Sequence, residues 1–298
     1  MNRINNLVVL GLLFVGTTSL AGGYADSLLA ERADHDASIR AGEIGPFTAI
    51  GQALLRDGQV VRVALAADTI LLDKPAADIG LPTMEIQWMK SSERVYVRTP
   101  MGGNFKIGHK RVGPVPLDYQ PGDTILAEKF RLQVYYNSRG GRVMAFDPEH
   151  AKRAHFEGLN YFDPDEAWRV EAKVEPIIDG ETVTMTTSLG LQKSYVRFAL
   201  LHFVSPEGTP FQLTLFQPVD GGDWGFLPFT DATSGSVTYG GGRYIDLDLS
   251  KSLGETVVID FNRAYNPYCA YTHYYNCPIP PSENCLSVAI EAGEKSYK

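Results

Sequence analysis

Short runs in which apolar and polar residues alternate place the strongest constraint on the fold of this chain. From about Pro46 onward such runs recur, separated by glycine, proline and asparagine. A period of two puts successive side chains on opposite faces of a strand, and regularly spaced turns are typical of antiparallel sandwiches or barrels. We therefore predict a mostly β protein. The predicted strands are residues 59–65, 69–72, 84–88, 94–98, 124–127, 130–136, 142–146, 168–176, 182–187, 195–204, 211–216, 244–249, 256–261 and 286–292.

Two stretches interrupt this rhythm. Asp26 to Ala41 is alanine-rich and charged and ends before Gly42, which predicts a short surface helix. Asp147 to Asp165 contains prolines and several charges, which predicts a connector with one helical turn from Pro148 to His155. We therefore expect two β-sandwich or barrel-like modules of antiparallel strands. The predicted divisions are a signal peptide (1–21), an N-terminal helix (22–45), an N-terminal β module (46–150) and a C-terminal β module (151–298).

The first residues have the pattern of a secretory signal peptide. Arg3 gives a positive start, Leu7 to Val15 is apolar apart from Gly11, and Ser19-Leu20-Ala21 is a cleavage pattern of small residues. Cleavage after Ala25 is an alternative. The apolar run is shorter than the roughly 20 residues that a spanning helix needs. We therefore expect an exported protein, periplasmic or extracellular, with no membrane segment after cleavage.

The charge balance argues against nucleic acid as a partner. The whole chain has 27 basic and 35 acidic residues, and removal of residues 1–21 deletes only Arg3, leaving a net charge of −9. A negative surface repels phosphate backbones. No pattern in the sequence indicates a particular cofactor or oligomeric state.

A proline-rich stretch from Asp260 to Cys285 is the best candidate for a functional site. Its prolines exclude long regular helices or central strands, and a long ordered irregular segment is usually functional. It contains side chains of the kinds that form sites, together with several tyrosines. The polar candidates are Asp260, Asn262, Arg263, Asn266 and Asn284.

The two predicted strands on either side of residue 250 could place a second carboxylate, Asp246, beside Asp260. If residues 243–249 and 256–262 form a hairpin, their apolar faces match when Asp246 lies opposite Asp260, with Arg243 near Arg263. Two such carboxylates share a proton or hold a hard cation. The alternative is a solvated polar face with the charges apart.

The remaining candidates come from a glycine-rich stretch and from the tyrosines. Gly240 to Gly242 permit positive φ and close backbone approach, but neither a phosphate-binding loop nor a dinucleotide fingerprint surrounds them. Asp231 is either a ligand or a turn-forming residue. The tyrosines offer a stacking platform for a sugar ring or another flat ligand, or else they pack the core. The tyrosine candidates are Tyr239, Tyr244, Tyr265 and Tyr271.

All three cysteines lie in the same region. Because export leads to an oxidising compartment, we predict a disulfide between Cys269 and Cys277. The alternatives are thiols that are unpaired or paired otherwise, and a zinc site with His273 and Cys285. The spacing is not the usual paired-cysteine form of a zinc site, and we predict no metal. A nucleophilic cysteine would need a lowered pKa.

The ordered motifs of the C-terminal half resemble the DUF1684 family, bacterial proteins of unknown function. The motifs are Phe229-Thr-Asp-Ala-Thr-Ser-Gly235, Thr238-Tyr-Gly-Gly-Gly-Arg-Tyr244, Asp260-Phe-Asn-Arg-Ala-Tyr-Asn-Pro267, Cys269-Ala-Tyr271, Cys277-Pro-Ile-Pro-Pro281, Glu283-Asn284 and Ala292-Gly-Glu-Lys295. The similarity extends upstream through Phe156–Phe162 and Trp168 to the helix at Arg32–Arg40. Thr230 and Val237 depart from the family pattern, and neither His273 nor Cys285 belongs to it. The resemblance implies no established activity.

Three functions stay open. The first is an enzyme of hydrolase type that uses Asp260 as acid, base or metal ligand, with Arg243, Arg263 and Asn262 stabilising an anion. The second is a binding module for an anionic or carbohydrate ligand. The third is a purely structural role, in which the motifs lock the loop onto the sheet.

Overall fold

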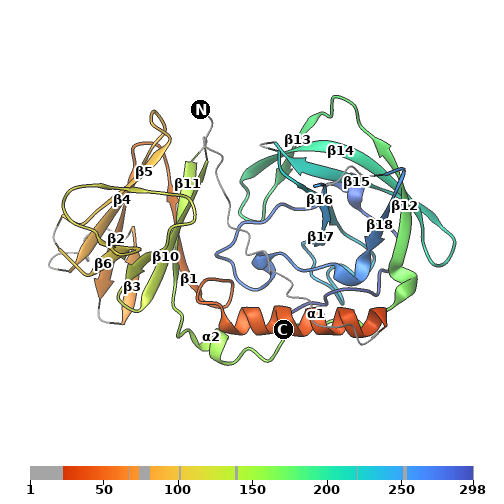
Figure 1. The fold of residues 1–298 in the computed structure, drawn as a ribbon, viewed down its shortest axis with the longest axis horizontal. Helices are drawn as coiled ribbons and strands as arrows, with labels where there is room; N and C mark the ends of the chain where they lie inside the picture. Colours follow the sequence, from red (N-terminus) through yellow and green to blue (C-terminus); the bar gives the residue numbers. More distant parts are fainter. Residues whose placement is uncertain are drawn as a thin grey trace. The chain divides into compact units, whose positions relative to one another are not determined.

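The structure is a computed structural model that describes residues 23–66, 68–73, 81–100, 102–137, 140–219, 221–250 and 254–297. The predicted signal peptide lies outside these residues. The contacts divide the chain into two compact units (Figure 1). Unit 1 contains Ile39–Phe156, and unit 2 contains the described residues up to Ser38 together with those from Glu157 onward.

Unit 1 consists of two antiparallel sheets around one apolar core. The six-stranded sheet has the order β1-β11-β10-β9-β6-β7, and the five-stranded sheet has the order β3-β2-β4-β5-β8. Alternate residues such as Val61, Ile86 and Val97 are fully buried, as the period of two predicts. The elements are β1 (Ala49–Leu55), β2 (Val60–Ala66), β3 (Thr69–Leu72), β4 (Thr83–Met89), β5 (Arg94–Arg98), β6 (Phe105–Ile107), β7 (Lys110–Arg111), β8 (Leu117–Tyr119), β9 (Ile125–Ala127), β10 (Phe130–Asn137), β11 (Gly140–Phe146) and α2 (Ala151–Ala154).

Unit 2 is built on one seven-stranded, nearly barrel-like sheet. Its order is β17-β16-β15-β14-β12-β18, and β13 also pairs with β14. The mostly antiparallel β fold with an N-terminal helix is therefore confirmed. The elements are η1 (Glu166–Trp168), β12 (Arg169–Pro176), β13 (Thr182–Thr186), β14 (Gln192–Val204), β15 (Pro210–Pro218), β16 (Trp224–Phe229), β17 (Arg243–Asp248) and β18 (Thr256–Asp260).

The two end strands of this sheet, β17 and β18, do not form the predicted hairpin. β17 pairs with β16, with Asp246 opposite Phe226, and β18 pairs with β12, with Asp260 opposite Arg169. The prediction that Asp246 lies opposite Asp260 is therefore wrong. Beyond β18 the chain returns to β17 at a single bridge between Tyr244 and Tyr265. The sheet is thus closed at one end and open along the rest of this edge.

The C-terminal segment is irregular and packs onto the sheet through short 3-10 helices. These are η2 (Phe261–Arg263), η3 (Tyr268–Ala270) and η4 (Ser282–Asn284). The strand predicted at residues 286–292 does not form. Isolated backbone hydrogen bonds join this segment to the residues after β16, from Leu286 N–H to Thr230 and from Ala232 N–H to Val288. Phe261 is fully buried and anchors the start of the segment among Trp168, Phe203 and Phe229.

Helix α1 (Tyr24–Ala41) is joined to unit 2 by a few buried side chains. The predicted helix from Asp26 to Ala41 is confirmed, and it begins two residues earlier. Arg32 donates to the carbonyl oxygens of Phe162 at 2.8 Å and Asn262 at 3.0 Å. None of the helices in the described residues combines the length and the apolar character that crossing a membrane requires.

Candidate functional site

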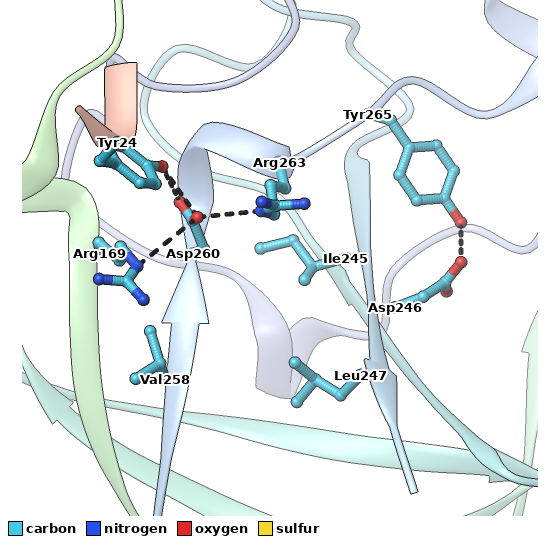
Figure 2. A pocket seen from close by; sticks show the side chains of 9 residues that line it. All are labelled: Tyr24, Arg169, Ile245, Asp246, Leu247, Val258, Asp260, Arg263 and Tyr265. Atoms are coloured by element: carbon cyan, nitrogen blue, oxygen red, sulfur yellow. Dashed lines mark hydrogen bonds and ion pairs between the residues drawn. The ribbon is translucent and has the colours of Figure 1, made fainter. Parts of the chain in front are cut away.

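The open edge between β17 and β18 contains a pocket of about 460 Å³ (Figure 2). This volume falls within the usual range for small-molecule sites, roughly 300–1,000 Å³. The pocket combines two carboxylates, two guanidinium groups and two tyrosines with an apolar wall. The lining residues are Tyr24, Arg169, Ile245, Asp246, Leu247, Val258, Asp260, Arg263 and Tyr265.

Asp260 lies at the end of β18 with its carboxylate surrounded by donors. Tyr24 Oη donates to it at 2.8 Å, and Arg263 Nε donates at 3.1 Å. The backbone N–H and side-chain amide of Asn262 each donate to Oδ1 at 3.1 Å, so Asp260 also caps η2. Burial and the neighbouring carboxylate raise the pKa of Tyr24, which therefore remains protonated as a donor. Asp260 is a fully hydrogen-bonded organising residue of the pocket.

The two guanidinium groups beside Asp260 differ in the number of carboxylates that they contact. Arg263 bonds both Asp260 and Glu31, although half of its side chain is exposed. Arg169 lies 3.9 Å from Asp260 and stacks over the Tyr24 ring, and 48% of its side chain is exposed. The contact with Asp260 and the stacking on Tyr24 involve Nε and one face of the guanidinium plane of Arg169. The exposed remainder of the Arg169 side chain borders the pocket.

Asp246 and Tyr265 lie on the other side of β17 from Asp260 (Figure 2). Tyr265 Oη donates to Asp246 Oδ2 at 2.9 Å. Asp246 still contacts solvent, but the surrounding protein raises its pKa, and the bond from Tyr265 partly offsets that effect. Burial also raises the pKa of Tyr265. The two carboxylates therefore have separate partners and do not form the shared pair considered from the sequence.

Replacing Tyr24 with phenylalanine should loosen the start of α1. The change removes the hydroxyl that bonds Asp260, and we expect a loss of about 1 kcal/mol, the usual net contribution of one hydrogen bond. Hydrogen exchange of the first α1 amides should become several-fold faster. Tyr268→Phe, at an exposed tyrosine, is the control. Equal protection of α1 in the two variants would show that the Tyr24 bond contributes nothing.

Arg243 and Asp231 lie away from the pocket and form a buried ion pair. Both side chains are fully buried, with Nη2 and Oδ2 3.3 Å apart. Arg243 also donates to the carbonyl oxygens of Ala292 and Ile290, and Asp231 accepts from Ile290 N–H at 2.7 Å. Gly242, with φ of +85°, precedes Arg243 where a side chain would collide with Pro280, as expected from the glycine run. The pair attaches the end of the chain to β17.

The predicted asparagines are buried connectors. Asn262 exchanges side-chain and backbone hydrogen bonds with Asp165, at 2.7 and 2.9 Å. Asn284 is fully buried and bonds both backbone groups of Thr214 and the carbonyl of Pro228. Both therefore hold loops against the sheet and do not face the pocket.

Asn266 and Tyr271 converge on Glu294, a carboxylate that is only 1% exposed. Asn266 donates to it from its backbone and side chain at 2.9 Å, and Tyr271 Oη donates as well. Burial raises the pKa of Glu294 to about 7, although these donors partly oppose the shift. This cluster is a second polar centre within unit 2.

The predicted disulfide is not formed in this structure, where all three cysteines are thiols. Cys269 and Cys277 are nevertheless neighbours, since the N–H of Cys269 donates to Cys277 Sγ at 3.3 Å. Tyr239 Oη donates to Cys269 Sγ at 3.7 Å. Tyr244 is buried and donates from its hydroxyl to the Pro278 carbonyl. The hydroxyls of Tyr239 and Tyr244 therefore bind the segment that contains Cys269 and Cys277.

The structure thus brings four residues considered from the sequence to the pocket, Asp246, Asp260, Arg263 and Tyr265. Sequence reasoning missed Arg169 and Tyr24, which are distant in the chain. The motif Trp168-Arg-Val carried a signal for Arg169, and the motif that ends at Lys295 contains Glu294. Within the described ranges, no three His, Cys, Asp or Glu side chains are close enough together to hold a metal ion.

Comparisons with known proteins agree with the motif analysis. The family model of DUF1684, a protein of unknown function, matches residues 154–295 and leaves out the helix at Arg32–Arg40. The solution NMR structure of an uncharacterized protein from Haloarcula marismortui is 41% identical, with a TM-score of 0.42. That match covers 48% of this chain and 79% of the other. No curated protein matches the chain. Through residues 154–295, the chain belongs to the DUF1684 family.

Proposed function

We propose that the chain is an exported binding protein that holds a small, neutral carbohydrate in the pocket between β17 and β18. The lining carries the proposal: two guanidinium groups, two carboxylates and two tyrosines surround an apolar wall. Sugars present both hydroxyl groups and apolar C–H faces. Charged donors and acceptors bind the hydroxyls, and aromatic rings and aliphatic side chains contact the C–H faces.

Charge balance favours a neutral ligand over an anion. Asp246 and Asp260 offset Arg169 and Arg263 within the lining, and Glu31 pairs with Arg263 just beside it. Asp260 Oδ2 lies 3.9 Å from Arg169 Nε. An anion that binds Arg169 would therefore also lie close to the Asp260 carboxylate, and the two negative charges would repel each other. Hydroxyl groups accept from arginine and donate to carboxylates without this penalty.

The same contacts weigh against hydrolysis with Asp260 as the base. Both of its oxygens already accept hydrogen bonds from Tyr24, Arg263 and Asn262. A general base needs a lone pair within reach of the proton that it removes. Asp246 lies across β17 and is bonded to Tyr265, so it does not supply the missing partner. Binding without catalysis therefore agrees better with the geometry.

The hydrogen bonds of Tyr24 help to choose between the two cleavage sites of the proposed signal peptide. Cleavage after Ala21 keeps Tyr24, whereas cleavage after Ala25 removes it together with its bonds to Asp260. We therefore favour cleavage after Ala21. Mass spectrometry of the N-terminal peptide from protein exported by its native host distinguishes the two sites, and a mature chain that begins at Asp26 would contradict this choice.

Binding can be tested by saturation-transfer NMR with glucose, galactose, N-acetylglucosamine and their disaccharides. At least one sugar should bind, and Arg169→Met should weaken that binding tenfold or more, about 1.4 kcal/mol, because the exposed guanidinium is lost. Lys173→Met, at another exposed cation of the same strand but outside the pocket, is the matched control. Equal weakening in both variants would contradict a site at Arg169.

Inorganic phosphate and sulfate serve as anionic probes in the same experiment. We expect no binding of either at moderate salt. Phosphate binding that weakens as salt increases and is lost in Arg169→Met would replace the carbohydrate proposal with an anionic ligand. Absence of binding by every sugar would contradict the carbohydrate class.

A further inference from the structure

Cys269 and Cys277 form a cluster of reactive groups outside the pocket. Eight residues apart in the chain, they are in contact through the hydrogen bond from Cys269 N–H to Cys277 Sγ. Both side chains are half-buried, and Cys285 is exposed. The Cys277 thiol also donates a hydrogen bond to Cys269 Sγ, so the two sulfur atoms are neighbours, and both side chains remain partly accessible from solvent.

The two thiols are attached to separate, well-anchored backbone segments. Cys269 lies in η3, which packs beside Tyr239, and Gly240–Gly242 continue from Tyr239 into β17. Cys277 is fixed to the turn after β13, because its N–H donates to Ser188 Oγ at 3.1 Å and its carbonyl accepts from Ser188 N–H at 2.8 Å. A covalent bond between the sulfur atoms would join these segments where they already meet.

The surroundings of Cys269 favour its ionised form. A hydrogen bond from Cys277 is the largest effect, and together with donors at Tyr239 and Ser188 it lowers the pKa of Cys269 to about 6, against the opposing effect of burial. Burial and the bond to Cys269 raise the pKa of Tyr239, so its hydroxyl keeps the proton that it donates. At neutral pH the Cys269 sulfur is mainly a thiolate, which is the nucleophilic form.

We propose that Cys269 and Cys277 form a thiol–disulfide exchange site that acts on disulfide substrates, with Cys269 as the attacking sulfur and Cys277 as the resolving one. An attacking thiolate held against a second thiol is the arrangement that such exchange requires. The site is independent of the pocket between β17 and β18. The disulfide predicted from the sequence is then the oxidised state of this pair.

The exchange balances without a cofactor. The Cys269 thiolate attacks one sulfur of R–S–S–R, so that a Cys269–S–R bond forms while R–S⁻ leaves and takes a proton from solvent. Cys277 then loses its proton and attacks Cys269 Sγ, which forms the Cys269–Cys277 bond and releases the second R–S⁻, itself protonated. Two electrons pass from the thiol pair to the substrate, which is reduced to two R–SH.

The first test measures alkylation of the reduced protein by iodoacetamide against pH, read cysteine by cysteine by mass spectrometry. Cys269 should react with a midpoint near pH 6, well below the pKa of about 8.5 of an unperturbed cysteine thiol. Cys277→Ala should raise the Cys269 midpoint because the largest donor is lost, whereas Cys277→Ser keeps a donor and should leave it low. Cys285→Ser is the control and should leave the Cys269 midpoint unchanged. A Cys269 midpoint near the unperturbed value of about 8.5 would overturn the proposal.

The second test uses glutathione disulfide as the substrate. Wild-type protein should form the Cys269–Cys277 bond, and Cys277→Ser should accumulate a glutathione adduct at Cys269 because the resolving thiol is gone. Dithiothreitol should reverse both products. Adducts confined to Cys285 would overturn the proposal, as would a Cys269–Cys277 bond that resists reduction in the folded protein, which is the behaviour of a structural disulfide.

Discussion

Replacing Arg243 with methionine should lower the free energy of unfolding of unit 2 by about 3–5 kcal/mol. The guanidinium is fully buried, and its partner Asp231 would remain buried as a carboxylate with no cation beside it. The same change removes the donors to the carbonyls of Ile290 and Ala292. A buried polar group without its partner costs more than the bond itself contributes.

The effect can be measured by urea unfolding with pulsed hydrogen exchange, read on peptides from β16 and β17 so that only unit 2 is reported. Arg263→Met is the matched control, because Arg263 forms two ion pairs but is half-exposed, and such pairs contribute about 1 kcal/mol or less. Adding Asp231→Leu to Arg243→Met should restore part of the stability, since it removes the unpaired charge. Equal losses for Arg243→Met and Arg263→Met would contradict a structural role for the buried pair.

The alternation of side chains was sufficient to predict most strands of both units. Residues 69–72 and 94–98 form strands with the predicted bounds, and the strands predicted at 182–187 and 195–204 correspond to the paired β13 and β14. These features depend on local patterns, in which a strand and its turn are adjacent in the chain. The strand predicted at 286–292 does not form because its apolar side chains are buried in the core of unit 2 while its backbone makes only isolated hydrogen bonds to the residues that follow β16.

The β17–β18 hairpin shows where local reasoning fails. The two strands are neighbours in sequence and their apolar faces match, so a hairpin satisfied every local rule. In the structure, Ile259 is instead placed opposite Val170 of β12, far back in the chain, where it joins the same core. A pattern of burial indicates which face of a strand is inside, but it does not indicate which strand lies beside it.

The pocket follows from that pairing, so only part of it was accessible from the sequence. The stretch after β18 indicated Asp260 and Arg263 because these residues lie together in the chain. Tyr24 bonds Asp260 across 236 positions, and Arg169 reaches it only because β12 pairs with β18. Likewise, the sequence indicated Arg243 and Asn284 as site candidates, and only the tertiary contacts show that they are buried connectors.

Glu294→Gln should remove a pH dependence of stability between about pH 4.5 and 7. Burial raises the pKa of Glu294 from 4.5 to about 7 in the folded protein, so the folded state binds this proton more tightly than the unfolded chain. The resulting stabilisation is complete below about pH 4.5, declines as the pH rises and is lost above about pH 7. The difference between the two values corresponds to roughly 3 kcal/mol.

Glutamine is neutral at every pH and still accepts a hydrogen bond from Tyr271 or Asn266, so the variant should change little in stability across this range. The free energy of unfolding of unit 2, measured from pH 4.5 to 8, should therefore fall more steeply in the wild type than in Glu294→Gln. Glu283→Gln, at an exposed glutamate paired with Arg197, is the control and should keep the wild-type slope. Parallel curves for wild type and Glu294→Gln would mean that this buried carboxyl group has the same proton affinity in the folded and unfolded chains. In that case the bonds from Asn266 and Tyr271 would fully compensate for its removal from water.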